Sequence, residues 1–302
     1  MEDLQRFAYR VKSLRMMKHM TKEEVCQDET ELTVRQLTRI ELGKSKPTLT
    51  KINFLADRLG MKIYELMPDY QDLPREYLEL KYHLLRDVTY SDVEKTAEKE
   101  ERLNQIYECY YANLPEEEQL IINSMRLIFE VQSSETPHLE QHILQDYIQQ
   151  VDTKETYTVN DLLLIRLLMM RFLLADKKVS LYQANLIPRL VVSLLETEHQ
   201  LRTYQLFILR DTLFVAVELC FYLEQHHHIA NLLDRLLEIM DTTQDYQKKA
   251  LLDMFEWKYQ LKIEKNLYQA HRFYRQAVLF ATLIKNKALL QKLQEEWKKD
   301  QE

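Results

Sequence analysis

Glycine is almost absent from the sequence. Only Gly43 and Gly60 occur among the 302 residues, so none follows position 60. Tight β-hairpins and phosphate-cradling loops depend on glycine. The chain also lacks sustained runs of alternating apolar and polar residues and any G-x-S-x-G sequence. These absences argue against a hairpin-rich sheet, a nucleotide-binding loop and a serine-hydrolase elbow. We therefore expect an all-α protein that is not an enzyme and needs no cofactor.

Cysteine is also scarce. Cys26, Cys109 and Cys220 are odd in number, far apart and outside any C-x-x-C spacing. Such an arrangement indicates neither a disulfide framework nor a thiolate metal site. We expect all three to be buried as small apolar residues.

The histidines do not predict a metal site. His138 and His142 lie four residues apart, but Glu140 does not directly follow the first of them, as the general base of a zinc protease would. The run His226–His228 is predicted to be a solvated turn between two helices, where a metal would bind only adventitiously. No metal is expected.

Long apolar runs are missing too. The richest one, residues 162–175, is interrupted by Arg166 and Arg171, and the start M-E-D-L-Q-R-F lacks the order of a signal peptide. With 29% charged and 46% hydrophobic residues, the composition is typical of a globular chain. We expect a soluble cytoplasmic protein with no membrane partner.

Charge is divided unevenly along the chain. Residues 1–70 contain 13 Lys and Arg against 11 Asp and Glu, whereas the rest contains 28 against 37. Around residues 33–51, Glu41 is the one acid among five bases, which are Arg35, Arg39, Lys44, Lys46 and Lys51. A basic head on an acidic body indicates an anionic partner for the head.

Residues 1–70 are predicted to form a domain of five short helices. The strings T-K-E-E from Thr21 and T-V-R-Q from Thr33 are capping boxes that predict helix starts. The two glycines predict left-handed C-caps. The predicted helices include residues 4–18, 34–42, 49–59 and 61–67, with one more beginning after Thr21. Two helices joined by a short turn, the second one basic, are typical of a helix-turn-helix.

The predicted helix 34–42 carries side chains that suit DNA. Leu37 and Ile40 would anchor it, which leaves Arg35, Gln36 and Arg39 facing outward. Arginine can span two acceptors of guanine, and glutamine can pair with adenine. Contacts with phosphates, which position the domain without reading sequence, are predicted for Thr33, Lys44, Lys46 and Lys51. A solvated basic helix in a protein-interaction module remains the alternative.

Residues 7–67 resemble the helix-turn-helix domain of the Xre and lambda-repressor-like family. That family has Gln early and Ala late in its second helix, and Ser-x-Ile-Glu-x-Gly at the end of its third. Here Lys22 and Cys26 replace the first two, and T-R-I-E-L-G fits the third. The resemblance implies binding to double-stranded promoter DNA, with Lys22 on a phosphate and Thr38 among the contacts.

The string V-C-Q-D-E-T-E-L-T-V-R-Q-L-T-R-I-E is similar to the head of Rgg-type streptococcal regulators, and within them to the ComR-type competence activators. This resemblance implies a tetratricopeptide-like body and quorum sensing through an imported, short, hydrophobic, tryptophan-rich peptide pheromone. It further implies release of the head, a ligand-dependent homodimer and activation of a competence regulator gene.

In the body, residues 71–302, a helix of one type recurs about every 44 residues. The stripe Leu162, Arg166, Met169 and Leu173 has counterparts one and two periods later, and a counterpart one period earlier that is apolar after its first member, Glu118. Amphipathic partners are predicted at residues 139–151, 182–196, 229–240 and 267–283. Stacked helix pairs form a solenoid whose concave face suits a peptide. Residues 285–299 are predicted to be a capping helix or an exchanged dimer arm.

Two arginines interrupt these apolar stripes at equivalent positions. Arg166 and Arg210 need partners, because an unpaired buried guanidinium is costly. They either pair internally, for example Arg210 with Asp211 or Glu218, or contact a bound peptide. Weaker peptide-binding candidates from the same helices are Arg171, Phe172, Gln205 and Phe214.

Three acids, Glu116, Glu117 and Glu118, follow Pro115 at the start of a predicted helix. Proline followed by acids is ordinary chemistry for a helix start. A sharper hypothesis is that these acids pair with Arg35 or Arg39 in the resting protein and hide the DNA-reading helix.

Two other functions stay open. One is a constitutive DNA-binding repressor whose solenoid only dimerises, and the other is an adaptor whose solenoid binds a partner protein. Ligand-dependent DNA affinity would exclude the first, and loss of DNA affinity in Arg35→Ala and Arg39→Ala would exclude the second.

Overall fold

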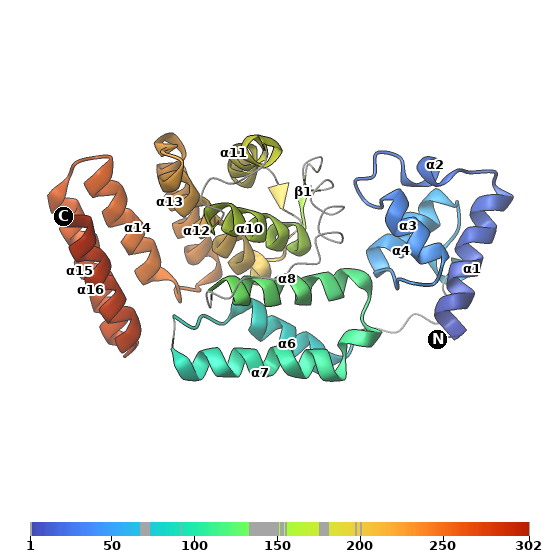
Figure 1. Cartoon of the computed structure of the whole chain (residues 1–302), viewed down its shortest axis with the longest axis horizontal. Coiled ribbons are helices and arrows are strands. Elements are labelled where there is room, and N and C mark those ends of the chain that lie inside the picture. The colour runs from blue at the N-terminus through green and yellow to red at the C-terminus, as the bar shows by residue number, and fades with distance from the viewer. Residues whose placement is uncertain are drawn as a thin grey trace. The chain divides into compact units, whose positions relative to one another are not determined.

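The computed structural model describes residues 2–66, 73–90, 92–132, 151, 154, 156–174, 181–196, 198–199 and 201–301. These residues are almost entirely helical, which confirms the predicted all-α class (Figure 1). The chain divides into two compact units, Met1–Tyr82 with Leu103–Glu155 and His83–Arg102 with Thr156–Glu302. The functional boundary expected near residue 70 stays a prediction. None of the described helices is both long and apolar enough to cross a membrane.

The first unit begins with the five predicted helices, α1 (Glu2–Met17), α2 (Lys22–Cys26), α3 (Val34–Glu41), α4 (Leu49–Arg58) and α5 (Ile63–Leu66). Both capping boxes are present, with the hydroxyls of Thr21 and Thr33 accepting hydrogen bonds from the third N–H of their helices. Gly43 and Gly60 have φ angles of +65° and +59°, a conformation that side chains with a Cβ disfavour. The local signals therefore predicted these helices correctly.

These five helices, called the head below, bury a common apolar core. Phe7 and Val11 of α1 belong to the same buried cluster as Leu37 and Ile40 of α3. Burial of this kind contributes roughly 1.5–3 kcal/mol per large side chain. The outward sides of α1 and α3 therefore point away from the interior that they share.

The cysteines fall into two classes. Cys26 and Cys220 are buried, as predicted, and burial raises the pKa of the Cys26 thiol to about 12. Cys109 is exposed, so the prediction that it is buried is wrong. It ends α7 (Val93–Cys109), whose inward side is taken by Leu103 and Ile106.

The predicted repeat is present in the body. The stripe-bearing helices α8 (Glu116–Gln132), α10 (Val159–Leu174), α12 (Leu206–Tyr222) and α14 (Lys249–Lys262) alternate with α11 (Leu181–Glu196), α13 (Ile229–Thr243) and α15 (Leu267–Leu283). Helix α6 (Arg75–Arg86) and α7 precede them. The partner helix predicted at 139–151 lies outside the described residues, apart from Val151. Pro188 lies inside α11 rather than at its start.

Short 3₁₀ turns join several helices: η1 (Tyr111–Asn113), η2 (Thr203–Gln205) and η3 (His226–His228). The last of these is the predicted histidine turn between α12 and α13. His138 and His142 lie outside the described residues. Among the residues that are described, no group of His, Cys, Asp and Glu side chains could hold a metal ion.

One short parallel pairing departs from a purely helical chain. Strands β1 (Thr156–Tyr157) and β2 (Glu198–His199) pair in register before α10 and after α11. Two residues per strand are too few to be read from sequence, because neither stretch shows a period of two over several positions.

The last helix, α16 (Lys287–Gln301), caps the solenoid in this chain. Its buried residues Leu289, Leu293 and Trp297 share a cluster with Trp257 of α14. The Trp297 ring stacks on Tyr274 of α15 at 4.5 Å, and the Trp257 indole N–H donates to Asp300 at 3.0 Å. The predicted capping role is therefore seen, whereas an exchange of this helix in a dimer stays a prediction.

Candidate functional site

The amino-terminal end of α3 is fixed from within the head. The Thr33 hydroxyl accepts from the Gln36 backbone N–H at 3.1 Å, and the Gln36 side chain accepts from the Thr33 N–H at 3.1 Å. The Lys51 ammonium donates to the same Gln36 oxygen at 2.8 Å. Gln36 and Lys51 are therefore buried, and the prediction that Gln36 faces outward is wrong. Its place as the third residue of the capping box turns it toward α4.

The other predicted DNA contacts on α3 and in the segment after it are at least partly accessible to solvent. Arg35 and Lys44 are exposed, while Thr38, Arg39 and Lys46 are half-buried. The Lys22 ammonium donates to the Thr38 hydroxyl at 2.7 Å, which holds the start of α2 beside α3. Most of the predicted DNA contacts thus lie on α3 and in the segments beside it, whereas Lys22 lies on α2 and Lys51 on α4. Arg35 and Lys44 are the exposed ones.

A buried carboxylate ties α3 to the two preceding helices. Glu41 accepts two hydrogen bonds from the Arg15 guanidinium, at 2.6 and 3.1 Å, and Lys22 lies 3.8 Å from it. The hydrogen bond with Glu41 raises the pKa of Arg15. Paired bonds of this geometry are among the stronger polar interactions in proteins, so α3 is held at a fixed angle to α1.

The first two acids of α8 contact the end of α3 and the segment that follows it. The Glu116 carboxylate accepts a hydrogen bond from the Ser45 hydroxyl and lies 3.6 Å from the Arg39 guanidinium. The Glu116 backbone N–H donates to the Lys46 carbonyl at 2.8 Å. All of these residues belong to the first compact unit.

Glu117 extends the same contact to α4. Its carboxylate accepts from the Thr48 hydroxyl at 3.0 Å and lies 3.1 Å from the Lys51 ammonium. Lys51 thus bridges Gln36 of α3 and Glu117 of α8. We call the set Arg39, Ser45, Thr48 and Lys51 with Glu116 and Glu117 the acidic clasp. The sequence hypothesis named Arg39 and the acids but missed Ser45, Thr48 and Lys51, for which no sequence signal exists.

Glu118 takes a different set of partners. It accepts hydrogen bonds from the Tyr77 hydroxyl at 2.5 Å and from Lys81 at 2.7 Å, both on α6. Burial and the Glu118 charge raise the pKa of Tyr77. Of the pairings hypothesised for these acids, that of Glu116 with Arg39 is present, whereas Glu117 meets α4 and Glu118 joins α8 to α6. That these contacts hide α3 from DNA stays a prediction.

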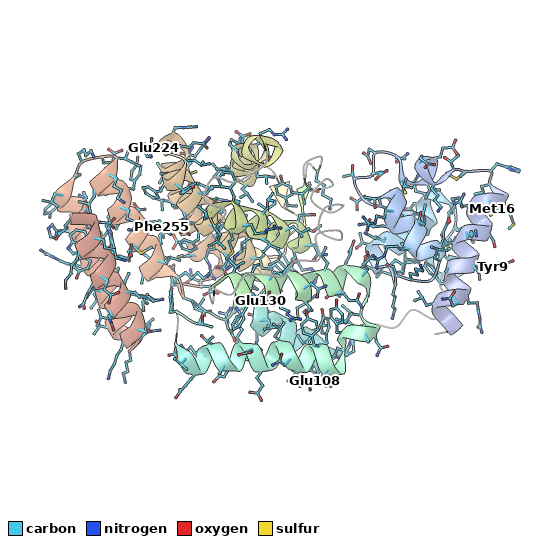
Figure 2. The ribbon with its side chains drawn as sticks, in the orientation of Figure 1. Tyr9, Met16, Glu108, Glu130, Glu224 and Phe255 are labelled. Atoms are coloured by element: carbon cyan, nitrogen blue, oxygen red, sulfur yellow. The ribbon has the colours of Figure 1, made fainter. Side chains whose placement is uncertain are left out.

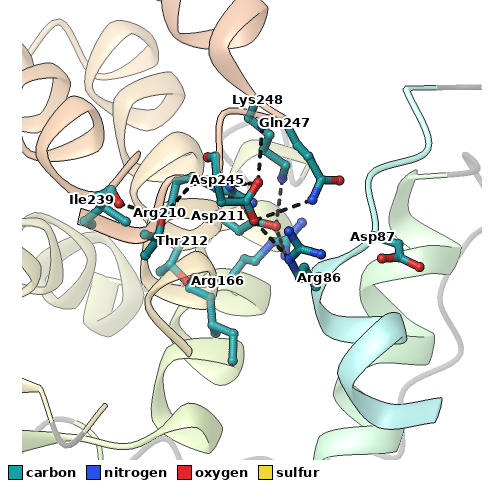
Figure 3. A network of polar contacts seen from close by, with 12 residues as sticks. Arg86, Asp87, Arg166, Arg210, Asp211, Thr212, Ile239, Asp245, Gln247 and Lys248 are labelled. Carbon is teal, nitrogen blue, oxygen red and sulfur yellow. Dashed lines mark hydrogen bonds and ion pairs between the residues drawn. The ribbon is translucent and has the colours of Figure 1, made fainter. Parts of the chain in front are cut away.

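A second polar cluster lies inside the second unit (Figure 3). Arg210 is fully buried and donates to the Asp211 carboxylate at 3.2 Å and the Asp245 carbonyl at 3.1 Å. Arg166 lies 3.6 Å and Lys248 2.7 Å from Asp211. The internal pairing allowed for Arg210 with Asp211 is thus present, and Glu218 is not among its partners here.

Burial and the nearby charges shift the pKa values of the residues in this cluster. Burial raises the pKa of Asp211, but Lys248, Arg210 and Arg166 together outweigh it, so the pKa is lowered overall. Burial lowers the pKa of Lys248 to about 7, although Asp211 opposes the shift. Cations outnumber acids around Asp211, and the Nε atom of Arg166 is buried without a hydrogen-bond partner among the described residues.

The remaining peptide-binding candidates lie on α10, on α12 and in the η2 turn that precedes α12. Phe172 is half-buried and meets the Tyr222 ring edge-on at 6.3 Å. Phe214 is buried against Phe255 at 6.1 Å. Arg171 and Gln205 are half-buried. These side chains lie on successive repeats, where a bound peptide would contact them. Their role stays a prediction.

Comparison with known proteins extends these observations. Residues 74–297 match the family model described as ComR tetratricopeptide. The chain is similar to the structure of ComR from Streptococcus suis, with 38% identity and a TM-score of 0.82 over 99% of this chain and 96% of that one. No curated protein matches the chain.

Two further structures are similar over nearly the whole chain. The apo form of the competence regulator ComR from Streptococcus vestibularis is 29% identical, with a TM-score of 0.85 and 98% of both chains covered. ComR from S. thermophilus in complex with DNA and its signalling peptide ComS is 28% identical, with a TM-score of 0.68, 98% of this chain and 100% of that chain covered.

Proposed function

The chain belongs to the ComR tetratricopeptide family, and on that premise we propose that it is a peptide-activated transcription regulator of competence. Its head binds promoter DNA, and its helical repeats bind a short hydrophobic signalling peptide. The observation that carries the proposal is the acidic clasp, which occupies the carboxyl end of α3 and the basic segment after it. Because the bound partner is promoter DNA, the protein acts in the cytoplasm and no catalysis is required.

DNA recognition is proposed for the exposed side of α3. Arg35 and Arg39 reach base edges, and Lys22, Thr33, Thr38, Lys44, Lys46 and Lys51 position the phosphates. Gln36 reads a base only if it gives up its bonds to Thr33 and Lys51, because both occupy its side-chain oxygen. Arg35 therefore carries most of the direct reading.

The same contacts suggest how the head is released from α8. Arg39 and Lys51 are held by Glu116 and Glu117, and a phosphate cannot approach them while those carboxylates stay in place. Peptide binding frees the head by favouring a state in which these contacts are open. A homodimer then places two heads on half-sites about 34 Å, or a multiple of it, apart along the duplex.

The peptide site is proposed on α10, α12 and the η2 turn before α12, and its residues are Arg166, Arg171, Phe172, Gln205, Arg210 and Phe214. Arg166 supports this proposal because its buried Nε lacks a hydrogen-bond partner among the described residues. Arg210 forms ion pairs with Asp211 and Asp245, and one of its terminal nitrogens is likewise buried without a hydrogen-bond partner among the described residues, so both arginines stay candidates for the ligand.

Fluorescence anisotropy tests the function directly. A labelled duplex from upstream of the small open reading frame nearest the gene is titrated with protein at stated salt, with and without synthetic C-terminal peptides of that frame. Binding that needs the peptide supports the proposal. Equal binding in both series indicates a constitutive DNA binder, and absence of binding in both refutes the DNA-binding assignment for that promoter.

A further inference from the structure

The outward side of α1 presents apolar side chains to solvent. Tyr9 is 74% exposed, Met16 58% and Met17 67%. Figure 2 shows Tyr9 and Met16 projecting from the outer side of the helix. Tyr9 and Met16 are seven residues apart, two helical turns, so they lie above one another on one face. The opposite side of α1 buries Phe7 and Val11 in the head core.

Cations flank this apolar strip. Arg6, Arg10 and Lys12 are exposed on the same side of α1, and residues 4–20 contain no Asp or Glu. In the described part of the chain these three side chains form no ion pair. We call Arg6, Tyr9, Arg10, Lys12, Met16 and Met17 the α1 face. A surface with an aromatic and methionine centre and a cationic rim is typical of an interaction site rather than of a solvated helix.

DNA binding does not account for the apolar centre of the α1 face. Helices α1 and α3 bury their inner sides in one core, and the Arg15–Glu41 pair fixes their packing. The Gln5 side chain, one turn before Tyr9, donates to the Gly43 carbonyl at 3.4 Å, so the start of α1 lies beside the segment proposed to contact phosphates. Phosphates nevertheless give no reason to expose Tyr9 and Met16, and promoter affinity is therefore measured in the test below.

We propose that the α1 face docks an acidic amphipathic helix of the transcription machinery when the protein is bound to its promoter. This inference rests on the proposed function. The cationic rim is complementary in charge to a partner helix that carries carboxylates on both sides of an apolar strip. The methionine side chains adapt to the shape of such a helix. A second copy of this chain is a poorer occupant, because two α1 faces would bring like charges together.

Substitution tests the inference. The variant Arg6→Glu/Tyr9→Ala/Arg10→Glu removes the rim and the aromatic centre at exposed positions, so the fold is retained. Its matched control is Tyr268→Ala/Arg272→Glu/Arg275→Glu on α15, where Tyr268 is 78% exposed and the charge change is the same. Each variant is assayed with peptide for promoter affinity by anisotropy and for single-round transcripts made by purified bacterial RNA polymerase holoenzyme.

The expected result is a fall in transcripts of about tenfold for the α1 variant at equal promoter occupancy, which corresponds to roughly 1.4 kcal/mol of lost contact. Promoter affinity should match that of the control variant. Unchanged transcription overturns the inference. So does a selective loss of promoter affinity, because the face would then belong to the DNA interface. Failure of the unmodified protein to bind the promoter refutes the proposed function instead.

Cross-linking gives an independent readout. The photoreactive amino acid p-benzoylphenylalanine replaces Tyr9 in the full chain, which is irradiated with peptide, promoter DNA and purified polymerase. The expected product joins position 9 to a polymerase segment rich in Asp and Glu, and Arg6→Glu/Arg10→Glu should abolish it. A cross-link to DNA, to a second copy of the chain or to nothing overturns the inference.

Discussion

Neutralising the acidic clasp should raise the affinity of the peptide-free protein for DNA. The variant is Glu116→Gln/Glu117→Gln, which keeps the length of both side chains. Glutamine still accepts the hydrogen bonds of Ser45 and Thr48, whereas the ion pairs with Arg39 and Lys51 are lost.

The magnitude follows from the exposure of these pairs. Arg39 is 34% exposed and Glu116 13%, so that pair contributes about 0.5 kcal/mol. Lys51 is 7% and Glu117 24% exposed, and this better shielded pair contributes about 1 kcal/mol. A total of about 1.5 kcal/mol shifts the closed-to-open equilibrium by about tenfold. DNA affinity without peptide should rise by that factor when the closed state predominates.

Removal of negative charge could by itself favour DNA, and two comparisons separate this effect. The control Glu118→Gln/Glu130→Gln makes the same charge change on α8, but Glu118 bonds Tyr77 and Lys81 and Glu130 pairs with Arg126. Anisotropy should show the tenfold gain only for the clasp variant, and only without peptide. Equal gains in both variants, or a gain that persists at saturating peptide, would refute the reasoning.

Three further predictions concern other parts of the chain. With saturating peptide, Arg35→Ala and Arg39→Ala should each weaken promoter binding by about tenfold or more, because each removes a contact of about 1–3 kcal/mol with a base; anisotropy showing less than a twofold change would contradict the assignment. Asp211→Asn should lower the free energy of unfolding in urea by about 3 kcal/mol, since it leaves several buried cations uncompensated; a loss below about 1 kcal/mol would contradict this. Burial raises the pKa of Glu256 to about 7, with Asp234 adding to the shift, so the folded state holds this proton more tightly than the unfolded state. Stability from this group is fully present below the ordinary pKa of 4.5 and is lost as pH rises from there through 7, so Glu256→Gln should stabilise the protein by about 1 kcal/mol at pH 8 and have little effect at pH 4.

The head was predictable because its signals are local. Capping boxes at Thr21 and Thr33 and left-handed glycines act within one helical turn, so helix ends could be placed within a few residues. Gln36 shows the limit of such reasoning. Its place in the capping box was visible, but its second partner, Lys51, comes from the next helix and turns the side chain inward.

Contacts between distant residues could not be predicted in the body. The stripe positions of Arg166 and Arg210 follow from the repeat, but Asp245 and Lys248, which complete the network, come from the loop before α14. The acidic clasp is similar: the acids of α8 were noticed from their charge, whereas the hydroxyls of Ser45 and Thr48 carry no pattern. Periodicity fixes which side of a helix is buried, and not which residue of another helix it meets.

The central claim is that peptide binding releases the head from α8. A Cys109→Ser background leaves Cys26 and Cys220, which are buried. Spin labels at Asp57→Cys on α4 and Arg126→Cys on α8, both exposed positions outside the proposed DNA contacts, then report the distance between the head and α8 by pulsed electron paramagnetic resonance. We predict a short distance between the labels without peptide and a longer distance with peptide. In Glu116→Gln/Glu117→Gln the longer distance should be present even without peptide. An unchanged distance in a sample whose DNA affinity rises with peptide would contradict it.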